Sequence, residues 1–289
     1  MKANLDCIPC FLKQTIEATR MATSDKTKHI KAVKQVMAYL QQVSLNLSPP
    51  EISKEVHHII RSVTNNSDPY EVVKKQANNQ AAKSYPHLQE IIKNSSDPLL
   101  TAITLAIIGN VIDFGTENRY SLEKTIETYL YTPLDKTSVA LFKKQLKNAK
   151  EILYLADNTG EIYFDKLLLH QIKTKDNNIT YVVKAHPIIN DAMKYDAISA
   201  GIKDYAVIIE GDKESPISCP GMVLSNASNE FQMKLEKADM VISKGQGNYE
   251  ALNDINRDVF FLLMIKCPLI SSEINEALGK PVFKYKAKK

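Results

Sequence analysis

From about residue 150 onward, short apolar runs alternate with helical stretches, and this alternation constrains the fold more than any other feature of the sequence. The five runs have the length and the aliphatic and aromatic content of buried strands: EILYLA, ITYVVKA, YAVIIE, ADMVIS and DVFFLLMI. Helical periodicity fills the segments between them, as in GEIYFDKLLLHQIKT. The pattern predicts a three-layer α/β/α fold, with a mostly parallel sheet covered by helices on both faces.

The first half of the chain has a different pattern, because apolar residues recur there every three or four positions, as in FLKQTIEATRMA. Asp68 followed by Pro69 predicts a helix start, and LLTAITLAIIGNVIDF is apolar nearly all round, which indicates a buried helix. We therefore predict an all-helical subdomain over residues 1–145 and an α/β domain over residues 146–289. The C-terminal KYKAKK is interpreted as a solvated basic tail.

Charge and hydropathy indicate which classes of binding partner the sequence does not favour. The 37 Lys and Arg residues exceed the 33 Asp and Glu residues by four, too small an excess to predict binding to nucleic acid or to a membrane surface. No apolar run reaches the roughly 18 residues of a membrane span, and the N-terminal segment lacks the apolar stretch of a signal peptide. We expect a cytoplasmic protein without a nucleic-acid or membrane partner; the oligomeric state stays open.

Polar residues gather where three of the predicted strands end. Asp157 and Asn158 follow the first strand, and Asn190 and Asp191 follow the second. A later strand ends in the segment SKGQGN, which contains Lys244, Gly245, Gly247 and Asn248. Because right-handed crossovers bring the carboxyl ends of parallel strands to one edge, we expect these side chains to lie together at a ligand site.

The residue types at this edge suit a divalent metal and a phosphate. Two carboxylates with an amide oxygen are typical ligands of Mg²⁺ or Mn²⁺, which keep several waters and so leave room for a substrate phosphate. Lys244 and the backbone N–H groups beside Gly245 suit the remaining phosphate oxygens. Glu161, in the first turn of the next helix, could orient or activate a water.

A simpler interpretation exists for each of these residues taken singly. Asp157, Asn158 and Asp191 could cap the helices that follow them, and the glycines could only make a turn. SKGQGN matches neither the phosphate-loop motif nor GxGxxG. The coincidence of metal-type and phosphate-type residues at three separate strand ends favours the functional interpretation.

Asn110 and Asp113 stand three residues apart in an otherwise apolar helical segment. Because burying an amide and an acid without partners is costly, they must face either the active-site edge or a neighbouring helix end. We prefer the first alternative.

Cys7 and Cys10 form a CxxC pair at the start of the first helix. A thioredoxin-like site needs a preceding strand and a structural zinc site needs two more ligands, and the sequence offers neither. Cys219 and Cys267 are isolated and could be core residues. The pair could hold a metal, react with oxidants or have no chemical role.

Six segments, in this order, resemble the damage-control phosphatases, the acidic-residue methyltransferase-one-like family formerly catalogued as a domain of unknown function: LDCIPCFLKQ, DPY, AIIGNVIDFG, LADNTGEIYFDKLL, PIINDA and SKGQGNYE. The resemblance extends from Asp6 to about Leu278. The CxxC opening is similar to the archaeal and bacterial branch.

The resemblance implies a metal-dependent phosphatase that acts on small phosphorylated metabolites, especially damaged or surplus sugar phosphates, with cobalt, nickel, manganese or magnesium. It also implies that Asp157, Asn158 and Asp191 hold the metal, that Glu161 lies beside the metal-bound water, and that Lys244 holds the phosphate. Gly245 and Asn248 would shape the phosphate loop, and Asn110 and Asp113 are further candidates for substrate contact.

Two other functions stay open. Part of the family has been credited with carboxyl methyltransfer, although DNTGE stands where a cofactor-binding glycine-rich turn would follow the first strand. A metal- or sugar-phosphate-binding protein without catalysis is the other alternative. Nothing in the sequence decides whether water or a carboxylate such as Asp157 would attack the phosphorus.

Overall fold

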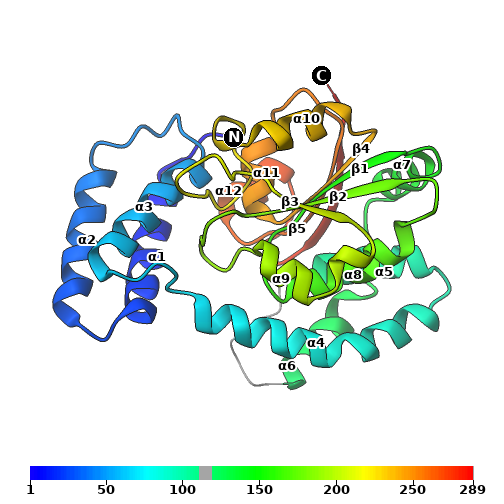
Figure 1. Cartoon of the computed structure of the whole chain (residues 1–289), viewed down its shortest axis with the longest axis horizontal. Helices are drawn as coiled ribbons and strands as arrows, with labels where there is room; N and C mark the ends of the chain where they lie inside the picture. Colours follow the sequence, from blue (N-terminus) through cyan, green and yellow to red (C-terminus); the bar gives the residue numbers. More distant parts are fainter. Residues whose placement is uncertain (111–118, 289) are drawn as a thin grey trace.

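The computed structural model describes residues 1–110 and 119–288. Six strands form one sheet in the order β3-β2-β1-β4-β5-β6 (Figure 1). β1 to β5 are parallel, and β6 runs antiparallel to β5. The strands are β1 (Glu151–Leu155), β2 (Asn178–Val183), β3 (Val207–Glu210), β4 (Met240–Lys244), β5 (Val259–Met264) and β6 (Pro281–Lys286).

The strand order places a topological switch point at the centre of the sheet. From β1 the chain moves outward through β2 to β3, and it then returns to β4 on the other side of β1 before moving outward to β6. The connections after β1 and β4 therefore leave the sheet in opposite directions, which opens a crevice beyond their carboxyl ends.

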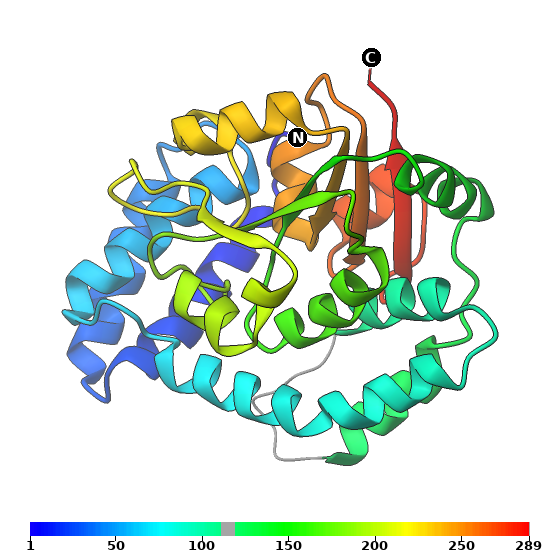
Figure 2. The ribbon, with the colours of Figure 1, turned by 45° about the vertical axis from the view of Figure 1, so that its right-hand side comes forward.

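Helices cover both faces of the sheet, as the alternation of strands and helices predicts (Figure 2). Successive strand residues point to opposite faces, so Tyr154 packs in the core on one side and Leu155 in the core on the other. The first face is covered by α4 (Glu71–Lys93), α5 (Pro98–Ile108), α7 (Lys136–Leu146), α8 (Glu161–Ile172) and α9 (Lys194–Ser199). The second is covered by α10 (Asn229–Lys237), α11 (Gln246–Leu252) and α12 (Pro268–Ile274).

The first three helices form a separate group with its own core of apolar side chains (Figure 1). They are α1 (Cys7–Ala22), α2 (Lys26–Leu40) and α3 (Pro49–Thr64), and α3 contacts α11. The later helices of the first half, with the short α6 (Arg119–Tyr129) beside α5, lie with the sheet instead. The division at residue 145 stays a prediction about folding units, because one core joins α4, α5 and α7 to the strands.

Two expectations about local structure need correction. The segment expected to be a solvated tail begins inside β6, where Lys284 and Lys286 pair with Phe261 and Val259 of β5. Long-range pairing with β5 makes this basic segment part of the edge strand of the sheet, which its local composition does not indicate. The helix expected to start at Asp68 begins instead at Glu71.

No helix among the described residues is long and apolar enough to span a membrane.

Phe142 joins α7 to the sheet and provides a test of this packing. Its side chain is fully buried, and its ring lies 5.1 Å from that of Phe260 and 5.4 Å from that of Phe283, edge to face in both cases. We expect Phe142→Ala to lower the free energy of unfolding by about 3–5 kcal/mol, because it leaves a cavity between helix and sheet. Denaturant unfolding would measure this. Lys144→Ala, on the exposed side of α7, should change the value by less than about 0.5 kcal/mol.

Candidate active site at the switch point

Backbone contacts bring the loop after β1 against the loop after β2. The Ala192 N–H donates to the Asp157 carbonyl at 2.8 Å, and the Thr159 N–H donates to the Asn190 carbonyl at 2.9 Å. Between these two bonds, Asn158 and Asp191 pair in an isolated antiparallel bridge. The predicted metal ligands, which are about thirty positions apart in the sequence, are therefore neighbours in the fold.

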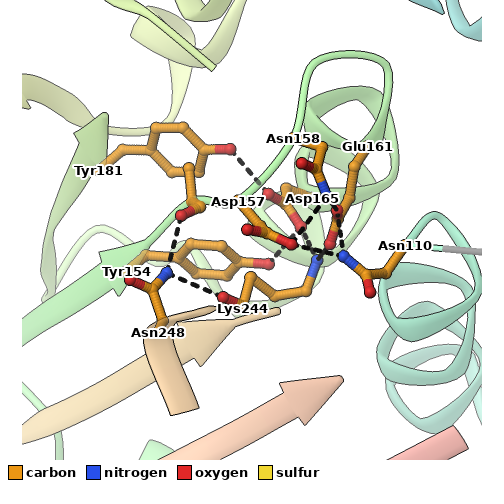
Figure 3. A network of polar contacts seen from close by, with 10 residues as sticks. Asn110, Tyr154, Asp157, Asn158, Glu161, Asp165, Tyr181, Lys244 and Asn248 are labelled. Atoms are coloured by element: carbon orange, nitrogen blue, oxygen red, sulfur yellow. Dashed lines mark hydrogen bonds and ion pairs between the residues drawn. The ribbon is translucent and has the colours of Figure 1, made fainter. Parts of the chain in front are cut away.

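Asp157 lies at the centre of the edge, beside the amides of Asn110 and Asn158 (Figure 3). Its Oδ2 accepts hydrogen bonds from Asn110 Nδ2 at 2.6 Å and from Asn158 Nδ2 at 2.8 Å. Gly245 has a φ of +80°, and a Cβ atom there would stand only 2.0 Å from the same oxygen. The carboxylate can occupy this place only because residue 245 has no side chain.

The carboxylates at this edge lie close enough to repel one another. Burial raises the pKa of Asp157 to about 7, and the negative charge of Glu161 contributes to the same shift against the ammonium groups of Lys266 and Lys244. Burial also raises the pKa of Asp191 well above its ordinary value, with Asp157 adding to the shift. A cation placed between these acids would remove the repulsion.

Lys244 lies below this edge in a fully buried ion pair. Its Nζ is 2.6 Å from Glu161 Oε1 and 2.5 Å from Asp165 Oδ1, and all three side chains are inaccessible to solvent. Tyr154 and Tyr181 also donate their hydroxyl hydrogens to Asp165, each at 2.7 Å. The Lys244 ammonium group is thus paired with two carboxylates (Figure 3).

Asn248 fixes the loop after β4. Its Nδ2 donates to the Lys244 carbonyl at 2.8 Å and to the Ala156 carbonyl at 2.9 Å, so it holds the end of β4 against the end of β1. Its Oδ1 accepts from the Met222 N–H at 2.7 Å. This buried amide therefore holds the loop after β4 in place, and its role at the site stays a prediction.

A cavity of about 370 Å³ opens in front of the edge. Asp157, Asn158 and Asp191 line it, together with residues of α1, α3, α11 and the loop after β5. We call Asp157, Asn158 and Asp191 the front row. The other predicted site residues lie behind it, against the sheet and α8: Asn110, Glu161, Lys244, Gly245 and Asn248. Asp113 lies outside the described residues.

The oxygen donors that line the cavity at the sheet edge fit a hard divalent cation. Among the described residues, no three His, Cys, Asp or Glu side chains converge as a complete ligand set. The front row instead offers two carboxylates and an amide, the incomplete oxygen set that is typical of a metal that retains waters. Asp157 Oδ1 and Asn158 Oδ1 accept no hydrogen bond from the described residues, so both oxygens are available.

Lys266 is a cation at this site that the sequence analysis missed. It lines the same cavity from the loop after β5, and in the described part of the chain its ammonium has no ion-pair partner. Its charge lowers the pKa of Asp157 more than that of Lys244 does, against the larger effect of burial. The sequence contains the pattern that could have identified this residue, because Lys266 follows a predicted strand just as Asp157 and Lys244 do.

Comparisons with known proteins identify the family of the chain. Residues 3–282 match the family model of the damage-control phosphatase ARMT1-like domain. The chain is 30% identical to a damage-control phosphatase of Archaeoglobus fulgidus over 98% of this chain and 99% of the relative. It is 32% identical to a damage-control phosphatase of Pyrococcus horikoshii over 96% of each.

The fold also has a close match among solved structures. A crystal structure of a DUF89 family protein from Pyrococcus horikoshii superposes with a TM-score of 0.89 at 31% identity and covers 100% of both chains.

The raised pKa of Asp157 should make the stability of the metal-free protein depend on pH. Its pKa is about 7 when folded and near 3.8 when unfolded, so the native state binds the extra proton and stability falls as pH rises between these values. The loss from this group is at most about 4 kcal/mol. Denaturant unfolding at pH 5 and pH 8 should show a smaller difference for Asp157→Asn than for the wild type. An equal difference in both proteins would contradict this assignment; exposed Asp176→Asn is the control.

Proposed function

The chain belongs to the damage-control phosphatase ARMT1-like family, and from this premise we propose that it is a metal-dependent phosphatase that hydrolyses monoesters of small metabolites, sugar phosphates among them. The family assignment supports a phosphatase for damaged or surplus metabolites. The observation that carries the metal dependence is the row of Asp157, Asn158 and Asp191, in which a half-buried and a buried carboxylate repel each other at the cavity.

Asp157, Asn158 and Asp191 would hold one divalent ion through their oxygens. When bound, such an ion polarises the phosphoryl group and lowers the pKa of a coordinated water. Mg²⁺ and Mn²⁺ suit these oxygen ligands best, and Co²⁺ and Ni²⁺ are the other candidates.

The protein's own side chains would orient the groups around the phosphate. Glu161 is held at Oε1 by Lys244 and at Oε2 by the amides of Asn110 (2.8 Å) and Asn158 (3.1 Å). A carboxylate held from both sides can keep an attacking water in one orientation. Gly245 and Asn248 would keep the loop after β4 from filling the space beside Asp157.

We assign the contact with the phosphate to Lys266 and a supporting role to Lys244. Lys266 is exposed at the cavity and has no carboxylate partner among the described residues, so its charge is available to a ligand. Lys244 would have to break two buried ion pairs to reach the same place. Breaking a buried pair costs about 3–5 kcal/mol.

Metal-restored turnover of 4-nitrophenyl phosphate tests the function. We expect metal-stripped protein to be inactive and to regain phosphate release when magnesium, manganese, cobalt or nickel is added. Asp157→Ala should lower kcat/KM at least about a hundredfold, since it removes a carboxylate from the metal. Retained activity with unchanged metal affinity would refute the assignment. No turnover with any metal, in folded protein, would instead favour carboxyl methyltransfer or binding without catalysis.

Lys266→Ala tests the assignment of the phosphate contact. We expect kcat/KM for 4-nitrophenyl phosphate to fall about 10- to 100-fold, with inhibition by inorganic phosphate weakened in parallel, because an ammonium that offsets phosphate charge is lost. Lys266→Arg should recover part of the loss. Lys237→Ala, at an exposed position of α10, is the matched control. A Lys266→Ala enzyme with wild-type kinetics would return the phosphate contact to Lys244.

A further inference from the structure

The cavity extends from the metal edge to a wall built by α1, α3 and the loop after β5, where the organic part of a substrate would lie. We propose, on the basis of the proposed function, that this wall selects an uncharged leaving group, so that the enzyme takes esters with one phosphoryl group and rejects those with a second. The wall also gives the CxxC pair a role.

Three thiols and several apolar side chains form this wall. Cys7 and Cys10 come from the first turns of α1, and Cys267 precedes α12. All three are free thiols, and they line the cavity with Phe11, Pro50 and Leu269. Such a surface offers little to a strongly hydrated anion.

The three thiols favour their uncharged form. Loss of solvation is the largest cause that raises the pKa of Cys7, of Cys10 and of Cys267. The charge of Glu250 raises all three further, and Cys7 and Cys10 each also respond to Cys267. Without a bound metal, Cys7 and Cys10 therefore contribute small neutral groups to the cavity.

The carboxyl groups of Glu250 and Asp6 lie on this side of the cavity, and burial raises the pKa of Glu250 to about 7. Glu250 is 7% exposed, and Gln246 links it to the wall by donating to Glu250 Oε1 at 2.9 Å and to Cys267 Sγ at 3.4 Å. Asp6, just before α1, is the other carboxylate on this side. A second phosphoryl group in this half of the cavity would face two acids.

Cations are too few at the cavity to offset a second phosphoryl group. Among the described residues that line it, Lys266 is the one ammonium, against the carboxyl groups of Asp6, Asp157, Asp191 and Glu250. A divalent ion would balance Asp157 and Asp191, which leaves Lys266 for the first phosphate. The buried Lys74 pairs with Asp68, and Lys184 lies 3.8 Å from Asp191, behind the lining.

Competition against 4-nitrophenyl phosphate turnover tests this selection with glucose 6-phosphate and glucose 1,6-bisphosphate as inhibitors. We expect the bisphosphate to have an inhibition constant at least tenfold higher than the monophosphate, although it offers two phosphoryl groups. The ratio of the two constants is the readout, because it cancels changes in overall activity.

An added cation in the wall should reverse the preference. Cys10 is exposed at the cavity, so a lysine there can remain hydrated while it faces the ligand. Cys10→Lys should lower the ratio at least fivefold, chiefly by tighter binding of the bisphosphate, whereas Cys10→Ser should leave the ratio within twofold. Gln42→Lys adds the same charge at an exposed position outside the cavity and should also leave it within twofold.

Three results would overturn the inference: a wild-type bisphosphate constant equal to or below that of the monophosphate, an equal effect of Cys10→Lys and Gln42→Lys, or no inhibition by either sugar phosphate. Each of these presupposes turnover of 4-nitrophenyl phosphate. Absence of that turnover would instead refute the proposed function.

Discussion

The buried ion pairs of Lys244 are the interaction on which the site depends. They join the last residue of β4 to two acids of α8, and the hydroxyl groups of Tyr154 and Tyr181 complete the surroundings of Asp165. An ammonium and two carboxylates without access to water tolerate few arrangements, because any loss of a partner leaves an uncompensated buried charge. The network therefore fixes α8 against the central strands, and with it the loop between Leu155 and Glu161.

The cavity side of the site holds acids of like charge, in contrast to the buried ion pairs of Lys244. Behind the edge, Lys244 is paired with Glu161 and Asp165. Asp157 and Asp191 instead share a cavity in which their repulsion and burial both favour the protonated form. Folding holds these acids together at a cost in stability, which the packed core on both faces of the sheet has to offset. A bound cation would turn this unfavourable arrangement into a binding site.

The switch-point topology explains why one edge can hold groups from so many parts of the chain. The loops after β1, β2 and β5 each contribute at least one residue to the cavity, among them Asn158, Asn190 and Lys266, and Gln246 joins them from the start of α11 after β4. The helices α1 and α3 then close the side away from the sheet (Figure 1). In the proposed function, the sheet edge would present the groups for the metal and the phosphate, and the N-terminal helices would face the rest of the substrate.

The sequence by itself determined the class of fold and the residues of the front row. Strand and helix periods are local properties, so the alternation after residue 150 predicted five of the six strands. The rule that parallel strands end at one edge predicts that Asp157, Asn158 and Asp191 lie together, and the bridge between Asn158 and Asp191 joins their two loops. Only the tertiary structure decided which basic residue faces the cavity: Lys244 and Lys266 both follow predicted strands, yet one is enclosed by α8 and the other remains exposed. Burial, the pairing of β6 with β5 and the approach of α1 to the sheet edge all depend on contacts between residues far apart in the chain, which local patterns do not encode.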